Sequence, residues 1–340
     1  MMLVNDLESL KKIWISWENH RRTRELSKAF GAKLYVFSSC RYKILRYILA
    51  SFYTLRVLIK EKPQILFVQN PSLVLAAFVS GLKKLRLFDY ILIVDRHTNF
   101  RLGKKPSLHL KSLLFYPLSN LSLRVADLTI VTNDFLKNLV EKKGGNGFVL
   151  PDKIPSLKKK NKLILEGKWN IVYICTFAPD EPYLEVFKAA KIISNDIFIY
   201  VTGDYSKLAP NILTKLPQNL VLTGYLSEQQ FVDILFEADV IMDLTTAEWC
   251  LVCGGHEALA AEKPFITSNK KVLTAYFYKG AIFTENNAEV IAKAIEKALF
   301  LKNKLKDEVK ELKKEKMEEW YKKFNVLRSI LKELSSRRCK

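Results

Sequence analysis

The sequence lacks any long apolar run and is short of negative charge. No stretch of eighteen uncharged apolar residues occurs in its 340 residues, so we expect no bilayer-spanning helix. Residues 1–12 lack the apolar core of a signal peptide, and we therefore expect a cytoplasmic protein. Only 35 Asp and Glu stand against 55 Lys and Arg, a formal net charge of +20.

Cysteine is scarce as well. The five cysteines, Cys40, Cys175, Cys250, Cys253 and Cys339, are scattered and odd in number, which argues against a disulfide framework. Cys250 and Cys253 form the one close pair, and a single C-x-x-C is weak evidence for zinc or for redox chemistry. We expect small buried side chains instead.

The positive charge lies mostly in the amino half. Residues 1–150 hold 25 Lys and Arg against 10 Asp and Glu, whereas the rest holds 30 against 25. This imbalance predicts an anionic partner for the first half: phosphates, an acidic membrane surface or nucleic acid. Nucleic acid is the weakest of these, because no zinc-finger or RNA-recognition signature is present.

Apolar strands alternate with helical segments in both halves, which predicts parallel sheets covered on both faces. The expected strands are 13–17, 33–37, 65–68, 90–94, 128–131, 148–150, 170–175, 197–202, 220–222, 240–242 and 265–267. The expected domains are 1–150 and 169–303, joined by a proline- and lysine-containing linker at 151–168 and followed by a helical segment at 304–340.

The second half contains a strand–glycine–helix–strand corner. Its first strand ends at Asp243, Gly254 and Gly255 precede a helix expected over 256–262, and the next strand begins at Phe265. Backbone N–H groups and the helix dipole at such a corner favour an anion. Glu257, one turn in, is placed to accept hydrogen bonds from a ribose. The alternative is an ordinary corner with a buried Glu.

The segment Glu257–Ile266, EALAAEKPFI, resembles the donor-nucleotide site of GT-B glycosyltransferases, in particular the retaining E-x7-E family (glycosyltransferase family 4-like). The first Glu of the motif is displaced, because Trp249 stands eight positions before Glu257 and the nearest carboxylate is Glu248. The resemblance implies an α/β fold of two Rossmann-like doubly wound domains, with the C-terminal helix crossing back to the N-domain. It also implies sugar transfer, in the interdomain cleft, from a UDP- or GDP-linked donor to a glycan or lipid-linked acceptor.

The resemblance further assigns a donor-binding set to the carboxyl half: Gly203, Gly224, Thr245, Gly254, Gly255, His256 and Glu257. The family's basic residues after the strand at Cys175 are missing, since Thr176–Pro182 is acidic. Diphosphate neutralisation is therefore expected from Lys270, Lys271, Arg96 or the helix start. No D-x-D triplet occurs, and the resemblance implies no metal and no cofactor.

In the amino half, polar clusters follow the strands at the edge where ligands of doubly wound sheets bind. The segment VDRHTN at 94–99 resembles the family's D-x-H-N element. The catalytic candidates are His20, Asp95, His97 and Glu248, and the acceptor-binding candidates are Trp17, Glu18, Arg21 and Asn70. Two alternatives stay open. The first is that His97 is a strand-end histidine hydrogen-bonded to the backbone, and the second is that His20 belongs to a solvated basic helix face with Arg21, Arg22 and Arg24. Asp95, Glu18 or His20 is the base if the reaction inverts; retention needs none.

Two basic and apolar stretches, 41–60 and 100–115, fit either an interfacial helix on anionic lipid at the inner membrane face or a core helix with a basic solvent face. Three other functions compete with sugar transfer. They are a nucleotide-sugar epimerase, a nucleic-acid-binding protein and a membrane-surface scaffold with a decayed active site.

Overall fold

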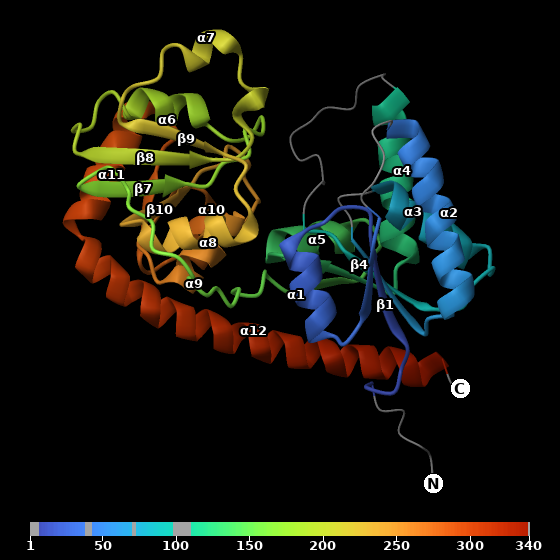
Figure 1. Cartoon of the computed structure of the whole chain (residues 1–340). Helices are drawn as coiled ribbons and strands as arrows, with labels where there is room; N and C mark the ends of the chain where they lie inside the picture. The colour runs from blue at the N-terminus through green and yellow to red at the C-terminus, as the bar shows by residue number, and fades with distance from the viewer. Residues whose placement is uncertain (1–6, 38–42, 70–72, 98–109, 339–340) are drawn as a thin grey trace. The chain divides into compact units, whose positions relative to one another are not determined.

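The computed structural model describes residues 7–37, 43–69, 73–97 and 110–338. The chain divides into two compact units (Figure 1). Unit 1 comprises Met1–Lys153 with Trp320–Lys340, and unit 2 comprises Ile154–Glu319. Their boundary falls inside the expected linker, most of which packs on unit 2: Leu157, Leu163 and Leu165 join its core.

Unit 1 contains, within its described residues, a six-stranded parallel sheet in the order β2-β1-β3-β4-β5-β6. Its strands are β1 Lys12–Ser16, β2 Lys33–Val36, β3 Ile65–Gln69, β4 Ile91–Asp95, β5 Leu128–Val131 and β6 Gly147–Val149. Its helices are α1 Arg21–Ala29, α2 Lys43–Glu61, α3 Leu73–Lys84, α4 Leu110–Val125 and α5 Asp134–Lys142.

Both faces of the unit 1 sheet are covered, which is why β3 and β4 are buried throughout and apolar up to their last residues, Gln69 and Asp95. On one face Trp14 stacks on Phe67 with ring centroids 5.0 Å apart, and both pack with Phe30, the C-cap of α1. The other face packs against α2 and α3 through Val57, Leu58 and neighbouring side chains.

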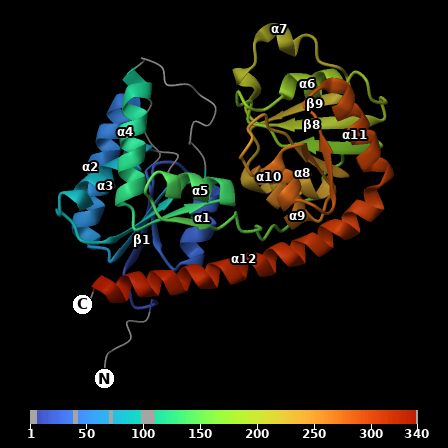
Figure 2. The ribbon, with the colours of Figure 1, turned by 180° about the vertical axis from the view of Figure 1, so that it is seen from behind.

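Unit 2 contains a second six-stranded parallel sheet, in the order β12-β11-β10-β7-β8-β9. Its strands are β7 Trp169–Tyr173, β8 Ile197–Thr202, β9 Leu220–Gly224, β10 Val240–Asp243, β11 Phe265–Ser268 and β12 Ala281–Thr284. Its helices are α6 Tyr183–Ala189, η1 Tyr205–Lys207, α7 Pro210–Leu213, α8 Glu228–Glu237, α9 Cys253–Ala261, α10 Lys271–Tyr276 and α11 Ala288–Phe300. Helices α6 and α11 pack on one face and α8 to α10 on the other (Figure 2).

The last helix, α12 Lys302–Arg338, contributes to the cores of both units. Val309 and Leu312 belong to a core of unit 2, whereas Trp320, Phe324 and Leu327 pack beneath the unit 1 sheet. The indole N–H of Trp320 donates to the carbonyl of Pro151 at 3.1 Å. The expected C-terminal helix is confirmed, and it begins at Lys302 rather than at residue 304.

The strand orders locate the edges at which a ligand is expected. In unit 1 the strand order reverses between the neighbours β1 and β3, because β2 lies on one side of β1 and β3 to β6 lie on the other. In unit 2 it reverses between the neighbours β7 and β10, because β8 and β9 lie on one side of β7 and β10 to β12 lie on the other. Ligands of doubly wound sheets bind outside the carboxyl ends of the strands at such switch points. The candidate residues therefore group into two edges, one in each unit.

Candidate functional site

At the unit 2 edge, the side chain of Asp243 caps helix α9. The helix begins at Cys253, three residues earlier than expected, so Gly254 lies in its first turn. Asp243 Oδ2 accepts a hydrogen bond from the N–H of Gly254 at 2.8 Å. Burial raises the pKa of Asp243 well above its ordinary value; the Gly254 N–H opposes this shift and the nearby Glu181, Glu257 and Asp180 add to it.

The glycines of this edge are required by close packing. A Cβ on Gly254 would lie 2.6 Å from Asp243 Oδ2, and one on Gly255 would lie 2.2 Å from the ring of Phe277. The Gly255 N–H is turned to the carbonyl of Val252 at 3.4 Å. Both N–H groups are thus used inside the protein, which corrects the expectation that they point outward to an anion. The predicted donor-binding role of Gly254 and Gly255 would therefore be to shape the corner.

Gly203 and Gly224 end β8 and β9 in the left-handed region, at φ +102° and +72°. A Cβ on Gly203 would lie 2.2 Å from the carbonyl oxygen of Cys175. The N–H of Gly203 donates to the carbonyl of Gly224 at 3.2 Å. Because glycine has no side chain, these two residues allow the backbones at the ends of β7, β8 and β9 to approach one another closely.

Thr245 joins the loop after β10 to its neighbours. Its N–H donates to Ser268 Oγ at 2.9 Å, and its hydroxyl donates to Asp180 Oδ2 at 3.3 Å. Its carbonyl accepts from Asn286 Nδ2 at 2.9 Å. This buried residue fixes the shape of the loop, a role that its position in the sequence did not reveal.

His256 and Glu257 are both buried in the first two turns of α9. His256 Nε2 lies 3.3 Å from the hydroxyl of Tyr276, and its ring lies edge-on to Phe277. Glu257 is close enough to Asp243 for its charge to raise the pKa of that carboxyl. The donor-binding candidates of α9 are therefore brought together at the carboxyl end of β10.

A second carboxylate, that of Glu181, fills the loop after β7. Glu181 Oε2 accepts from the N–H groups of Thr176 at 2.9 Å and Ala178 at 2.8 Å, and Oε1 accepts from the Thr176 hydroxyl at 2.9 Å. Phe177, between these donors, is in the left-handed region at φ 56°. Successive N–H groups in such a turn form an anion-binding concavity, and here the protein's own carboxylate occupies it.

Two lysines lie near this acidic edge. Lys270 Nζ pairs with Glu248 Oε1 at 2.6 Å, and Lys207 Nζ donates to the carbonyl of Thr176 at 2.6 Å. The catalytic candidate Glu248 is exposed. Its ion-pair partner Lys270 is one of the residues expected to neutralise a diphosphate. Lys207 is a cation that the sequence reasoning missed, because it precedes no recognisable motif.

At the unit 1 edge, Arg22 is buried rather than part of a solvated basic face. Its guanidinium donates to both oxygens of Asp95, at 2.8 to 3.0 Å, and to Asp152 Oδ1 at 2.7 Å. It also donates to the carbonyl of Leu150 at 2.9 Å. Burial alone would lower the pKa of Arg22, but the two carboxylates raise it above its ordinary value.

The same pairing makes Asp95 unsuited to the predicted role of a general base. Asp95 is fully buried. Although burial by itself raises the pKa of Asp95, Arg22 and His97 hold it below its ordinary value. Asp95 Oδ2 also lies 3.7 Å from His97 Nδ1. We therefore expect the carboxylate to position Arg22 and His97 and not to accept a proton from a substrate.

His20 and His97 lie together, with ring centroids 5.0 Å apart. His20 caps helix α1, because its Nδ1 accepts from the N–H of Arg22 at 3.2 Å. Burial and the neighbouring His97 lower the pKa of His20 to about 4. The neutral imidazole therefore carries its proton on Nε2 and presents a donor at that atom.

The acceptor-binding candidates are only partly placed at this edge. The structure corrects the prediction that Trp17 binds the acceptor, because Trp17 lies in the core and its indole N–H donates to Thr54 Oγ1 at 3.1 Å. Glu18 is exposed and Arg21 is half-buried, whereas Asn70 lies outside the described residues. Gln69 ends β3, is fully buried and accepts from Ser16 Oγ. Its Nε2 has no hydrogen-bond partner in the described part of the chain.

Arg96, expected as a source of positive charge for the diphosphate, is also buried. Its guanidinium donates to Ser119 Oγ at 2.9 Å, and burial lowers its pKa to about 10. Of the cysteines expected to be buried, Cys175 is buried, whereas Cys250 is half-buried and Cys253 is exposed at the start of α9. Cys40 and Cys339 lie outside the described residues.

Within the described ranges, no group of three or more His, Cys, Asp or Glu side chains is arranged to hold a metal ion. No helix in those same ranges is both long and apolar enough to cross a membrane.

The paired doubly wound sheets and the C-terminal helix define the GT-B fold class, and comparison with solved structures confirms it. No protein-family model and no curated protein sequence matches the chain. The structure is similar to that of Anabaena HepE in complex with UDP, with a TM-score of 0.68 and 11% identity, covering 96% of this chain and 100% of HepE.

Sucrose-phosphate synthase from Thermosynechococcus elongatus gives a TM-score of 0.72 at 11% identity, covering 99% of this chain and 98% of that one. A glycosyltransferase from Rickettsia africae gives 0.60 at 13% identity, covering 97% and 90%. At these identities the likeness shows the fold, and it extends over both units.

Proposed function

We propose that the protein is a glycosyltransferase that moves a sugar from a nucleotide sugar to a glycan or lipid-linked acceptor. The observation that carries the proposal is the full-length likeness to HepE in complex with UDP-glucose, with a TM-score of 0.68 over 94% of this chain and 99% of that one. The structure of HepE in complex with UDP and glucose is also similar to that of this chain. These neighbours favour a UDP-linked donor over a GDP-linked one.

In this proposal the donor binds at the unit 2 edge. Gly203 and Gly224 allow the ends of β7, β8 and β9 to lie close together, and Glu257 of α9 holds the ribose. Because the Gly254 N–H is bonded to Asp243, the diphosphate draws its positive charge from Lys270 and Lys207 instead. Fixed cations and dipoles of this kind stabilise a leaving group electrostatically. No metal or other cofactor is needed in this scheme.

The unit 1 edge supplies the groups for the acceptor and the sugar. The Nε2–H of neutral His20 and the imidazole of His97 lie side by side, so both can bind sugar hydroxyls. Of the three bases considered for an inverting reaction, Asp95 is paired with Arg22 and the His20 Nδ1 is bonded to backbone. Glu18, which is exposed, is the base that remains for inversion.

A lipid-linked acceptor would bring the enzyme to a membrane surface, and a cytoplasmic nucleotide sugar would place it at the inner face. A sugar epimerase is the second candidate. A proposed UDP-N-acetylglucosamine 2-epimerase of Listeria monocytogenes has a TM-score of 0.58 at 14% identity, covering 88% of this chain and 81% of that one. Turnover of a UDP-sugar without any acceptor would favour the epimerase.

The first test is thermal stability in the presence of UDP, GDP, ADP or CMP, with and without a chelator. We expect UDP to raise the melting temperature of the wild type regardless of the chelator, and the rise to be lost in Glu257→Ala. Glu296→Ala, an exposed carboxylate on α11, is the matched control and should keep the shift. Absence of a shift with every nucleotide would reject the donor site.

A further inference from the structure

Helix α2 exposes an apolar stripe on its outer face, interrupted by the exposed side chain of Arg56. The exposed side chains are Leu45, Ile48, Leu49, Phe52 and Ile59. At ~100° per residue these positions fall within about 100° of arc, so they form one line along the helix. The 19 residues of α2 span about 28 Å at ~1.5 Å per residue.

This outer face is not part of the core. The buried positions of α2, among them Ala50, Val57 and Leu58, lie on the opposite side and pack against the sheet with α3. Phe52 is 66% exposed and Ile48 is 61% exposed. A helix that needed only one apolar face to fold therefore carries a second one, and contiguous exposed apolar patches mark interaction sites.

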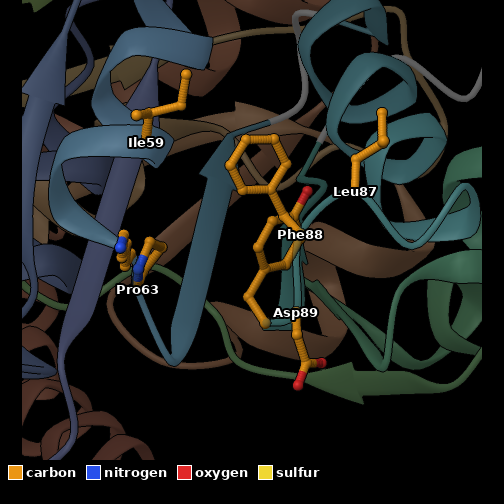
Figure 3. A pocket seen from close by; sticks show the side chains of 7 residues that line it. Ile59, Pro63, Leu87, Phe88 and Asp89 are labelled. Carbon is orange, nitrogen blue, oxygen red and sulfur yellow. The ribbon is translucent and has the colours of Figure 1, made fainter.

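The turn between α3 and β4 extends the stripe. Leu85 and Leu87 of this turn are exposed. Leu87 and Ile59 line the same surface pocket together with Pro63 and Phe88 (Figure 3). The pocket thus joins the end of α2 to the turn, and we call the apolar side chains of α2, Leu85 and Leu87 the α2 surface.

Basic side chains of α2 and of the neighbouring turns lie within or next to the α2 surface in the sequence. They are Arg46, Arg56, Lys60, Lys62, Lys84 and Arg86. None of the six forms an ion pair with a carboxylate in the described part of the chain. The nearby carboxylates are engaged, because Glu61 pairs with Lys11 and Lys33, and Asp89 pairs with Arg338.

We propose that the α2 surface docks on an anionic membrane, with α2 lying parallel to the bilayer. Leu45, Phe52 and Ile59 would enter the headgroup region, and the flanking Arg and Lys would contact lipid phosphates. Apolar residues on one helix face with cations beside them are the pattern of an interfacial helix. Juxtamembrane cations are attracted by the negative potential of anionic lipid.

The charge pattern argues against the other occupants. A second copy of the chain docked by the same surface would oppose one set of six cations to another, which is unfavourable. Nucleic acid would engage the cations through its phosphates but would leave Ile48, Phe52 and Leu87 without a partner. An anionic bilayer satisfies both the apolar and the basic side chains.

The test is co-sedimentation of the full chain with vesicles of phosphatidylcholine and phosphatidylglycerol, and with phosphatidylcholine vesicles alone. We expect binding to the mixed vesicles that weakens at high salt. Phe52→Glu and Ile48→Glu should each lower the affinity by about tenfold or more. Arg56→Glu with Lys60→Glu should do the same. The matched control is Phe300→Glu, an exposed aromatic of unit 2, which should bind like the wild type.

Three results would overturn the proposal: no sedimentation of the wild type with mixed vesicles, equal binding by Phe52→Glu, or an equal loss in Phe300→Glu. A concentration-dependent dimer abolished by Phe52→Glu, without vesicle binding, would assign the surface to a second copy. Because Phe52 and Ile48 are both exposed, the two variants should keep the circular dichroism and melting temperature of the wild type. The assay contains no nucleotide, so its outcome is independent of the proposed glycosyltransferase activity.

Discussion

The two candidate ligand-binding edges are built on similar sheets but carry opposite arrangements of charge. At the unit 1 edge a buried cation, Arg22, is held by Asp95 and Asp152, and two histidines lie beside this cluster. At the unit 2 edge carboxylates occupy the backbone donors: Asp243 on Gly254, and Glu181 on Thr176 and Ala178.

The difference shows that a doubly wound sheet supplies the position of a site but not its charge. Helix starts and turns offer N–H groups at the carboxyl ends of parallel strands. In unit 2 these donors are already used by the protein's own anions, so an added phosphate needs cations such as Lys270. In unit 1 an arginine balances the carboxylates of Asp95 and Asp152, and His20 and His97 lie beside this cluster.

The largest expected effect comes from breaking the unit 1 pair. In Arg22→Leu the fully buried carboxylate of Asp95 loses its bidentate partner. Removing one partner of a buried ion pair costs about 3–5 kcal/mol. We expect a loss of that size in the free energy of unfolding, measured by urea denaturation.

Arg21→Leu is the matched control for this prediction. Arg21 is the preceding residue of α1 and is half-buried, and its replacement should change stability by less than about 1 kcal/mol. Equal effects of the two substitutions would mean that the Arg22–Asp95 pair does not hold α1 against the sheet.

The second prediction sets the pH dependence of the two edges against each other. The pKa of His20 falls from 6.5 to about 4 on folding, so the unfolded chain binds the proton more readily. The contribution of neutral His20 to the free energy of unfolding is fully present above pH 6.5 and is lost as the pH falls to about 4. The pKa of Asp243 is raised instead, so its charging destabilises the fold as the pH rises above 3.8.

His20→Asn keeps a helix-capping acceptor, and Asp243→Asn keeps an acceptor for Gly254, while neither replacement titrates. Relative to the wild type, His20→Asn should gain stability as the pH falls through its window, by about 1–3 kcal/mol. Asp243→Asn should gain stability as the pH rises. Urea titrations at a series of pH values measure both, and parallel pH profiles would contradict the opposition of the two edges.

Local patterns in the sequence predicted much of this architecture. The alternation of apolar strands and helical segments predicted eleven of the twelve strands in the described residues; β12, Ala281–Thr284, was not expected. The long-range pairs were not predictable in this way. Arg22 and Asp95 are 73 positions apart, so no local spacing distinguishes a buried arginine from its exposed neighbours.

Trp17 and Gly254 were misread for a related reason. Each stands at a strand end or helix start where ligands usually bind, yet each is satisfied by a partner distant in sequence: Trp17 by Thr54 and Gly254 by Asp243. Position at an edge can be inferred from the sequence pattern. Whether a donor at that edge is open depends on packing between elements, which the pattern does not contain.

The smallest effect is expected from Glu181→Gln, which tests whether the unit 2 edge competes with phosphate. Glutamine keeps an oxygen for the N–H groups of Thr176 and Ala178 but removes one negative charge near the proposed diphosphate position. We expect UDP to bind a few-fold more tightly, because a like charge close to a bound anion weakens it. Glu185→Gln, on the neighbouring helix α6, should leave the affinity unchanged. Isothermal titration with UDP at low and high salt separates the cases: the gain should shrink as salt screens the charge. An unchanged or lower affinity in Glu181→Gln would mean that UDP does not approach the loop after β7.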